Sequence, residues 1–274
     1  VTGVPGAGKT LVGLNIANER HQYDKQEHAV FLSGNGPLVA VLREALVRDE
    51  IKRCKGKITK ITSKRKVAAF IQNIHHFRDT YLPPSEQVPA EKVTIFDEAQ
   101  RAWTKEQTAK FMLKRHVPSW NMSEPEFLIS VMDRHQDWAV IICLIGGGQE
   151  IHTGEAGLLA WFDALRNHFP HWNVYVSPQI SDVEYTQGKT LESLFMGLHL
   201  YQEKKLHLSV SLRSFRNEKV SAFVKSLLDE NLPIAQQLYS ELSLNYPIVI
   251  TRSLEKAKQW VQNQSRGTER YGLI

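Results

Sequence analysis

Residues 3–10 read Gly3-Val4-Pro5-Gly6-Ala7-Gly8-Lys9-Thr10 and match the phosphate-binding pattern G-x-x-x-x-G-K-[ST] at every fixed position. The pattern works because glycines let backbone N–H groups approach a phosphate closely. The lysine reaches the β and γ oxygens, and the final hydroxyl binds magnesium. The stretch therefore predicts a site for a Mg²⁺-bound nucleoside triphosphate, lined by Gly3, Pro5, Gly6, Ala7, Gly8, Lys9 and Thr10.

The residues around this loop decide between a true phosphate site and a chance glycine-rich turn. Apolar residues at Leu11, Leu14 and Ala17 predict the helix that the pattern requires, which argues against the chance turn. Only Val1 and Thr2 precede the loop, so the strand that should lead into it is cut short. We therefore expect this sequence to be part of a longer chain with flanking domains.

Composition is that of a soluble globular protein. The 274 residues are 42% hydrophobic and 23% charged, which suffices for one full α/β domain and part of a second. No stretch approaches the roughly 20 apolar residues of a membrane helix, so we expect no membrane partner. Cys54 and Cys143 lie far apart, so we expect neither a disulfide framework nor a zinc ribbon, and a cytoplasmic location.

Positive charge is concentrated in one segment, residues 48–66. It holds nine basic residues against two acidic ones, Asp49 and Glu50. Such a segment attracts phosphate backbones and makes their binding sensitive to salt. A solvated surface is the alternative, and the run of charge alone does not decide between the two.

Strands and helices are expected to alternate along residues 1–204. The expected elements are strands at 28–33, 93–96 and 138–145, and helices at 38–46, at 67–77 and after a capping box formed by Ser123 and Glu126. The strand at 138–145 is apolar throughout, which is typical of the centre of a parallel sheet. The alternation indicates an α/β fold with a doubly wound parallel sheet and a site along its carboxyl edge.

A second domain is expected to begin near Lys204. The residues after it predict a strand at 206–212, a helix at 220–228, a strand at 247–251 and a helix at 254–261 capped by Ser253. We therefore divide the chain into a first domain, 1–204, and the beginning of a second α/β domain, 205–274.

Polar residues follow two of the expected strands. Asp97 and Glu98 come directly after the strand at 93–96, where Asp97 would bind Mg²⁺ or its water and Glu98 would activate the attacking water. Gln149 follows the most apolar strand, and both Gln149 and Gln100 are candidates to contact the γ-phosphate or that water. Solvated turn residues are the alternative at these positions.

Five segments occur in the order and rough spacing of the ATPase core of superfamily 1 DNA/RNA helicases: GVPGAGKT, FLSGNGPL, IFDEAQRAW, LIGGGQEIHTGE and LSVSLRSFR. More narrowly, the chain resembles the Schlafen group 3-like helicase domain, also called domain of unknown function 2075, over nearly its whole length. FLSGNGPL and GGGQEIHTGEAG are the specific segments, whereas the first and third motifs are generic to P-loop ATPases. The resemblance implies a RecA-like P-loop NTPase domain, followed by the start of a second one, with ATP and Mg²⁺ as cofactors.

The resemblance also implies roles outside the phosphate loop. Asn35, Gly36 and Pro37 match the motif that lies beside single-stranded DNA or RNA in superfamily 1 enzymes. Arg213 matches the arginine that reaches the γ-phosphate from the second domain. A cation supplied by a separately moving domain stabilises the charge of the transition state only when the two halves close.

Two functions remain open at this stage. The first is a nucleic-acid-dependent ATPase or helicase-like motor, and the second is an ATP-controlled switch or binding module in a regulatory or defence protein. The chain carries Gly147-Gly148 where superfamily 1 helicases usually have an aspartate, so these residues do not by themselves indicate strand separation. A small-molecule kinase is disfavoured because no lid or acceptor pocket is recognisable.

Aromatic and histidine residues give weaker signals. Trp103, which follows the DEAQ turn, is the best of the six tryptophans for stacking on a base, although an aromatic among apolar neighbours is usually core. The histidines have no Cys or carboxylate partners at metal-binding spacing, so we expect structural or surface roles for them.

Overall fold

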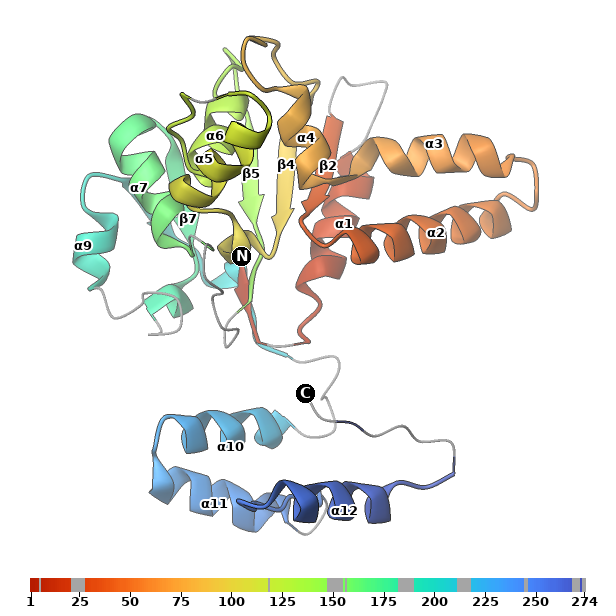
Figure 1. Ribbon diagram of the computed structural model, residues 1–274, viewed down its shortest axis with the longest axis vertical. Coiled ribbons are helices and arrows are strands. Elements are labelled where there is room, and N and C mark those ends of the chain that lie inside the picture. Colours follow the sequence, from red (N-terminus) through yellow and green to blue (C-terminus); the bar gives the residue numbers. More distant parts are fainter. Residues whose placement is uncertain are drawn as a thin grey trace. The chain divides into compact units, whose positions relative to one another are not determined.

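The chain forms two units in the computed structural model, Val1–Arg213 and Ser214–Ile274. The structure describes residues 1–4, 6–20, 28–117, 119–146, 155, 157–181, 190–210, 218–243, 246–267 and 272. Strands and helices alternate in the first unit, whereas the described part of the second unit is helical (Figure 1).

Parallel strands form the centre of the first unit (Figure 1). They are β1 (Thr2–Gly3), β2 (His28–Ser33), β3 (Ile71–Asn73), β4 (Glu91–Asp97), β5 (Val140–Cys143), β6 (Ile145–Gly146) and β9 (His207–Leu208). They pair in the orders β3-β2-β4-β5 and β6-β1-β9, and every pair is parallel.

The two ladders are joined where β5 passes into β6. Leu144 lies between these strands, and its N–H donates to the carbonyl of Phe96 at 2.8 Å. The next N–H, of Ile145, donates to the carbonyl of Val1 at 2.9 Å. The segment 140–146 therefore lies between β4 and β1, as expected for the most apolar strand of the chain.

Helices cover both faces of this sheet. They are α1 (Lys9–Arg20), α2 (Gly36–Arg53), α3 (Lys60–Phe70), α4 (Ile74–Thr80), α5 (Lys105–Lys114), α6 (Glu124–Met132) and α7 (Leu159–His168). Successive residues of β2 enter different cores: Phe31 packs with residues of α1, α2 and α3, and Leu32 with residues of α4, α5, α6 and α7. The predicted α/β fold, with a parallel sheet flanked by helices, is confirmed.

The helix expected at 67–77 is wrong in its middle. α3 ends at Phe70, Ile71–Asn73 forms β3 beside β2, and α4 begins at Ile74. The apolar spacing suits a helix, but the open edge of β2 offers unpaired backbone groups that a strand can satisfy. Asn73 then starts α4 by accepting the N–H of His75 at 2.9 Å.

A two-stranded parallel sheet follows α7. β7 (Asn173–Val176) pairs with β8 (His199–Gln202), and α9 (Leu191–Phe195) lies between them in the sequence. A 3₁₀ turn at Lys204–Leu206 then leads into β9, which pairs with β1. His207 and Leu208, from the strand expected at 206–212, thus pair within the sheet of the first unit, because β1 offers a free side on which a parallel strand can pair.

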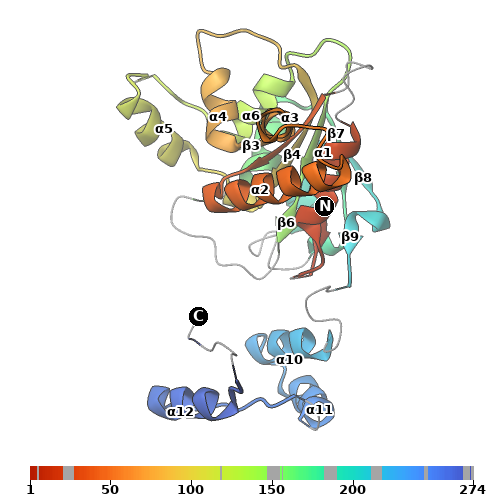
Figure 2. The same ribbon diagram turned by 90° about the vertical axis from the view of Figure 1, so that its right-hand side faces the viewer.

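The second unit contains α10 (Glu218–Leu228), α11 (Leu232–Leu242) and α12 (Leu254–Gln264). Figure 2 shows these helices with no strand drawn between them. The strand expected at 247–251 is therefore wrong, because an extended segment needs a neighbour to pair with and the described residues of this unit supply none. The cap expected at Ser253 is confirmed, since its hydroxyl accepts the N–H of Lys256.

Candidate functional site

The residues expected to bind phosphate lie at the carboxyl edge of the first sheet. β1 ends at Gly3 and β4 ends at Asp97. Ser33, the last residue of β2, pairs in register with Asp97. Ligands of doubly wound sheets bind at this edge, because the loops that follow parallel strands meet there.

Three glycines give the phosphate loop its shape. Gly6 has a φ of 77° and Gly8 a φ of 85°, a left-handed backbone that side chains disfavour. At Gly3 an added Cβ would lie 2.9 Å from the Cβ of Leu208, so this position has no room for a side chain. The loop is thus built for close approach of its backbone, and Pro5, also expected to line the site, lies outside the described residues.

Lys9 begins α1, and its ammonium group lies over the loop. Nζ donates to the carbonyl of Gly3 at 2.7 Å and to that of Val4 at 3.3 Å. The N–H of Ala7 donates to the same Val4 carbonyl at 3.1 Å. The lysine and the backbone turn therefore place a full positive charge at the start of a helix, where an anion is favoured.

Thr10 joins the phosphate loop to the acidic end of β4. Its hydroxyl donates to the two carboxylate oxygens of Asp97 at 3.2 and 3.3 Å. Burial, helped by the negative charge of Glu98, raises the pKa of Asp97 to about 6, while the Thr10 hydroxyl acts in the opposite direction. A cation beside Asp97 would favour its ionised form, and the oxygens of Thr10 and Asp97 are the hard donors that Mg²⁺ prefers.

Glu98 follows Asp97 in a strained backbone conformation. Its φ of 53° and ψ of 46° are left-handed, which is uncommon for a residue with a side chain and is often found at functional sites. Gln100 is buried, and its Nε2 donates to Glu98 Oε2 at 2.5 Å. The Gln100 amide, expected to contact the nucleotide, therefore holds the Glu98 carboxylate in this structure.

The turn expected to contact nucleic acid lies beside these carboxylates. Asn35 and Pro37 are exposed, and Gly36 is half-buried. Asn35 caps α2, because its Oδ1 accepts the N–H of Leu38 at 3.1 Å. The turn follows Ser33 and therefore leaves the sheet next to the end of β4. Gln149 and Arg213, the other two predicted site residues, lie outside the described residues.

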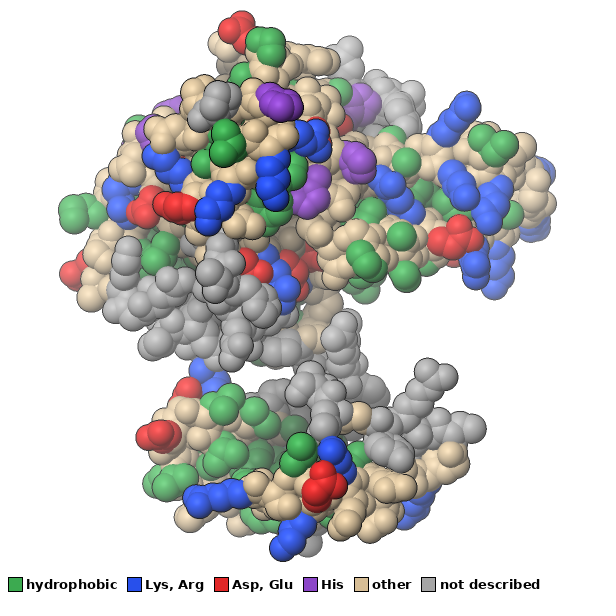
Figure 3. Space-filling model, viewed as in Figure 1, with side chains coloured by type: hydrophobic (Ala, Val, Ile, Leu, Met, Phe, Trp, Pro, Cys, Tyr) green, Lys and Arg blue, Asp and Glu red, His purple; other side chains and the backbone are tan. Residues whose placement is uncertain are grey.

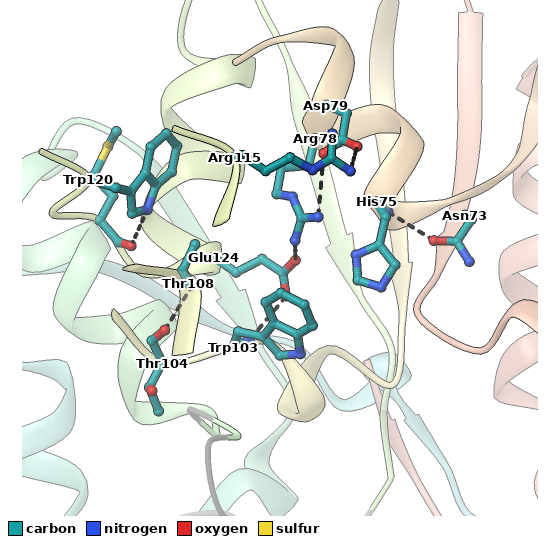
Figure 4. A network of polar contacts seen from close by, with 11 residues as sticks. Asn73, His75, Arg78, Asp79, Trp103, Thr104, Thr108, Arg115, Trp120 and Glu124 are labelled. Atoms are coloured by element: carbon teal, nitrogen blue, oxygen red, sulfur yellow. Dashed lines mark hydrogen bonds and ion pairs between the residues drawn. The ribbon is translucent and has the colours of Figure 1, made fainter. Parts of the chain in front are cut away.

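A buried polar network that no sequence motif indicated surrounds Trp103 (Figure 4). Arg78 has no exposed surface, and its Nη1 lies 3.3 Å from Oε1 of Glu124, which is 2% exposed. The other oxygen of Glu124 accepts the N–H of Trp103 at 3.0 Å. Arg78 also meets Asp79 at 3.4 Å, and Asp79 pairs with Arg115 at 2.9 Å.

The network contacts the side chain of Trp103, the tryptophan expected to be the best placed for base stacking. The ring of Trp103 is half-buried, with the ring of His75 centred 5.2 Å away and the guanidinium of Arg78 5.1 Å from its centre. Burial raises the pKa of Glu124, while the N–H of Trp103 and the charge of Arg78 oppose that shift. Trp103 is thus held by packing and by a hydrogen bond to its backbone.

Within the ranges that the structure describes, no group of three or more His, Cys, Asp or Glu side chains could hold a metal ion. His171 instead bonds Asp133 at 2.7 Å. Across the same residues, none of the helices combines the length and the apolar character needed to cross a lipid bilayer.

Comparison with known proteins identifies the family. A comparison with curated proteins gives no match. The family described as Schlafen group 3, DNA/RNA helicase domain, matches the chain over residues 1–274. The match covers the phosphate loop, the acidic end of β4 and the second unit alike. The chain therefore belongs to the Schlafen group 3 DNA/RNA helicase domain family.

Proposed function

We propose that this chain is a RecA-like P-loop domain that binds ATP with Mg²⁺ and hydrolyses it in response to single-stranded DNA or RNA. The observation that carries the proposal is the 3.2 Å contact between the Thr10 hydroxyl and the Asp97 carboxylate. It brings together a phosphate loop and an acidic strand end, the two halves of a Mg²⁺–nucleotide site. Membership of a helicase-domain family supports nucleic acid as the partner.

Each residue of the site has a chemical task in this proposal. The loop N–H groups and the Lys9 ammonium neutralise phosphate charge, and Thr10 and Asp97 offer oxygens to the metal. Mg²⁺, when bound, would offset the charge that develops on the phosphates. Glu98 accepts the proton of the attacking water. Gln100 positions Glu98, because its amide donates to that carboxylate.

Nucleic acid would act through the turn at the start of α2. Asn35, Gly36 and Pro37 would contact the bound nucleic acid. They follow Ser33, which lies one β-strand spacing, about 4.8 Å, from Asp97 at the end of β4. Gln149 would contact the γ-phosphate or the attacking water. Arg213, at the border of a second RecA-like domain, would stabilise transition-state charge on closure.

The experiment measures phosphate release by the intact protein with ATP and Mg²⁺, alone and with single-stranded DNA or RNA. We expect nucleic acid to raise the rate, and Lys9→Ala to abolish it, because no other cation in the loop neutralises the phosphates. Lys105→Ala, an exposed lysine at the start of α5, is the matched control and should retain the wild-type rate.

The outcomes separate the two functions left open by the sequence. Robust hydrolysis that ignores every nucleic acid would overturn the motor and favour an ATP-controlled switch. Absence of ATP binding would overturn both.

Gln100 offers a prediction of its own. Gln100→Met keeps the length of the side chain but removes the amide that holds Glu98. We expect kcat to fall about tenfold with little change in ATP affinity, as is typical when a residue supporting a reacting group is lost. A rise in Kd for ATP at unchanged kcat would instead assign Gln100 to nucleotide contact, the role that the sequence suggested.

A further inference from the structure

α2 and α3 form a helical hairpin that extends from the β3 edge of the sheet (Figure 1). Val47 and Val67 are buried between the helices and the sheet. Near the free end, the hydroxyl of Ser63 donates to Glu50 at 2.5 Å, which ties α3 to α2. The Thr59 side chain caps α3. The hairpin is therefore an ordered projection, and these contacts hold the backbone from which the side chains of its tip extend.

All the acidic side chains of the hairpin tip are already paired. Glu44 lies 2.9 Å from Arg48 and 3.3 Å from Lys60. Asp49 pairs with Arg53 at 2.9 Å, and Glu50 with Lys66 at 3.4 Å. These ion pairs leave no carboxylate in residues 44–66 to neutralise further basic side chains.

Five basic side chains of the same tip have no ion pair among the described residues. All five are exposed, and Figure 3 shows Lys and Arg side chains gathered over this end of the hairpin. They are Lys52, Lys55, Lys57, Lys64 and Arg65. Five uncompensated positive charges on one ordered projection make a surface that attracts a polyanion with regularly repeated charges. Such a polyanion releases its bound counterions when lysine and arginine neutralise its phosphates.

The length of α2 relates this tip to the proposed nucleic-acid turn. α2 has 18 residues and therefore spans about 27 Å from Gly36 to Arg53. A nucleic-acid duplex rises about 3.4 Å per base pair, so about eight base pairs cover the same distance. One nucleic acid can thus meet the start of α2 and the hairpin tip together.

We infer that the hairpin tip binds the phosphate backbone of the nucleic acid about 27 Å away from the contact at Asn35. The placement rests on the proposed function, because it takes the strand at Asn35 as its starting point. The binding of phosphates by the tip does not depend on the proposed function, because lysine and arginine contact phosphates without reading the bases and without ATP.

The test removes two charges from the tip and two from the opposite edge of the sheet. The tip variant is Lys57→Gln with Lys64→Gln. The control is Lys204→Gln with Lys205→Gln, an exposed pair in the turn before β9, at the far end of the strand order from β3. Both variants change the net charge equally, and at Lys64, in α3, glutamine keeps the helix propensity of lysine.

Binding is measured on the intact protein without nucleotide, by fluorescence anisotropy of labelled DNA and RNA, single-stranded and duplex. With probes of about 24 base pairs or nucleotides, we expect the tip variant to bind about tenfold more weakly at about 0.1 M salt. Its slope of log K against log salt should fall by about one per lysine removed.

Three outcomes would overturn the inference. They are wild-type binding by the tip variant, an equal loss in the control, and competition by polyglutamate as strong as by nucleic acid. Failure of ATP hydrolysis would not affect this result, because Lys9→Ala should retain the full binding of the hairpin.

Discussion

Replacing Glu98 with glutamine is expected to lower kcat for ATP hydrolysis by about 10²- to 10⁴-fold while ATP still binds. The amide has the shape of the carboxylate but cannot accept the proton of the attacking water. The hydrogen bond from Gln100 can persist after an amide flip, so the side chain should stay in place. Rates of phosphate release and the Kd of a fluorescent ATP analogue measure the two quantities separately.

The backbone at position 98 makes glutamine the right substitution. A left-handed residue with a side chain is strained, and glutamine carries the same penalty as glutamate, so stability should not change. Glu106→Gln, at the exposed start of α5, is the control for loss of a negative charge and should leave kcat unchanged. A kcat for Glu98→Gln within a few-fold of wild type would show that another group takes the proton.

Local sequence was sufficient to predict that Thr10 and Asp97 meet at one edge of the sheet. The phosphate loop has fixed residue types because its backbone geometry demands glycine, and Asp97 follows an apolar strand that has to end at the sheet edge. The conformation of Glu98 and its bond to Gln100 could not be predicted. They depend on the packing of the turn against Gly146, whose N–H faces the Gln100 amide oxygen at 3.4 Å.

Two of the differences between the expected and the observed fold have one cause. Ile71 and His207 lie in segments whose own pattern suits a helix or a new domain, but each pairs with a strand distant in the sequence. Hydrophobic periodicity reports the face a segment buries and not the open strand edge that it meets. The pairing of Arg78 with Glu124 was missed for the same reason, because 46 residues separate them and neither belongs to a local motif.

Removing one partner of that pair should destabilise the protein strongly. Glu124→Ala leaves the guanidinium of Arg78, which has no exposed surface, without its buried counter-charge. It also removes the acceptor of the Trp103 N–H. We expect the free energy of unfolding to fall by about 3–5 kcal/mol, as measured by urea denaturation.

Two further variants test whether the loss of stability comes from leaving a buried charge without its partner. The double variant Arg78→Met with Glu124→Leu removes both charges and should recover much of the loss, because hydrophobic residues often replace a buried ion pair at little cost. Arg115→Met breaks the exposed end of the same network, its pair with Asp79, and should cost at most about 1 kcal/mol. If Glu124→Ala costs no more than Arg115→Met, the buried pair does not hold the turn at Trp103.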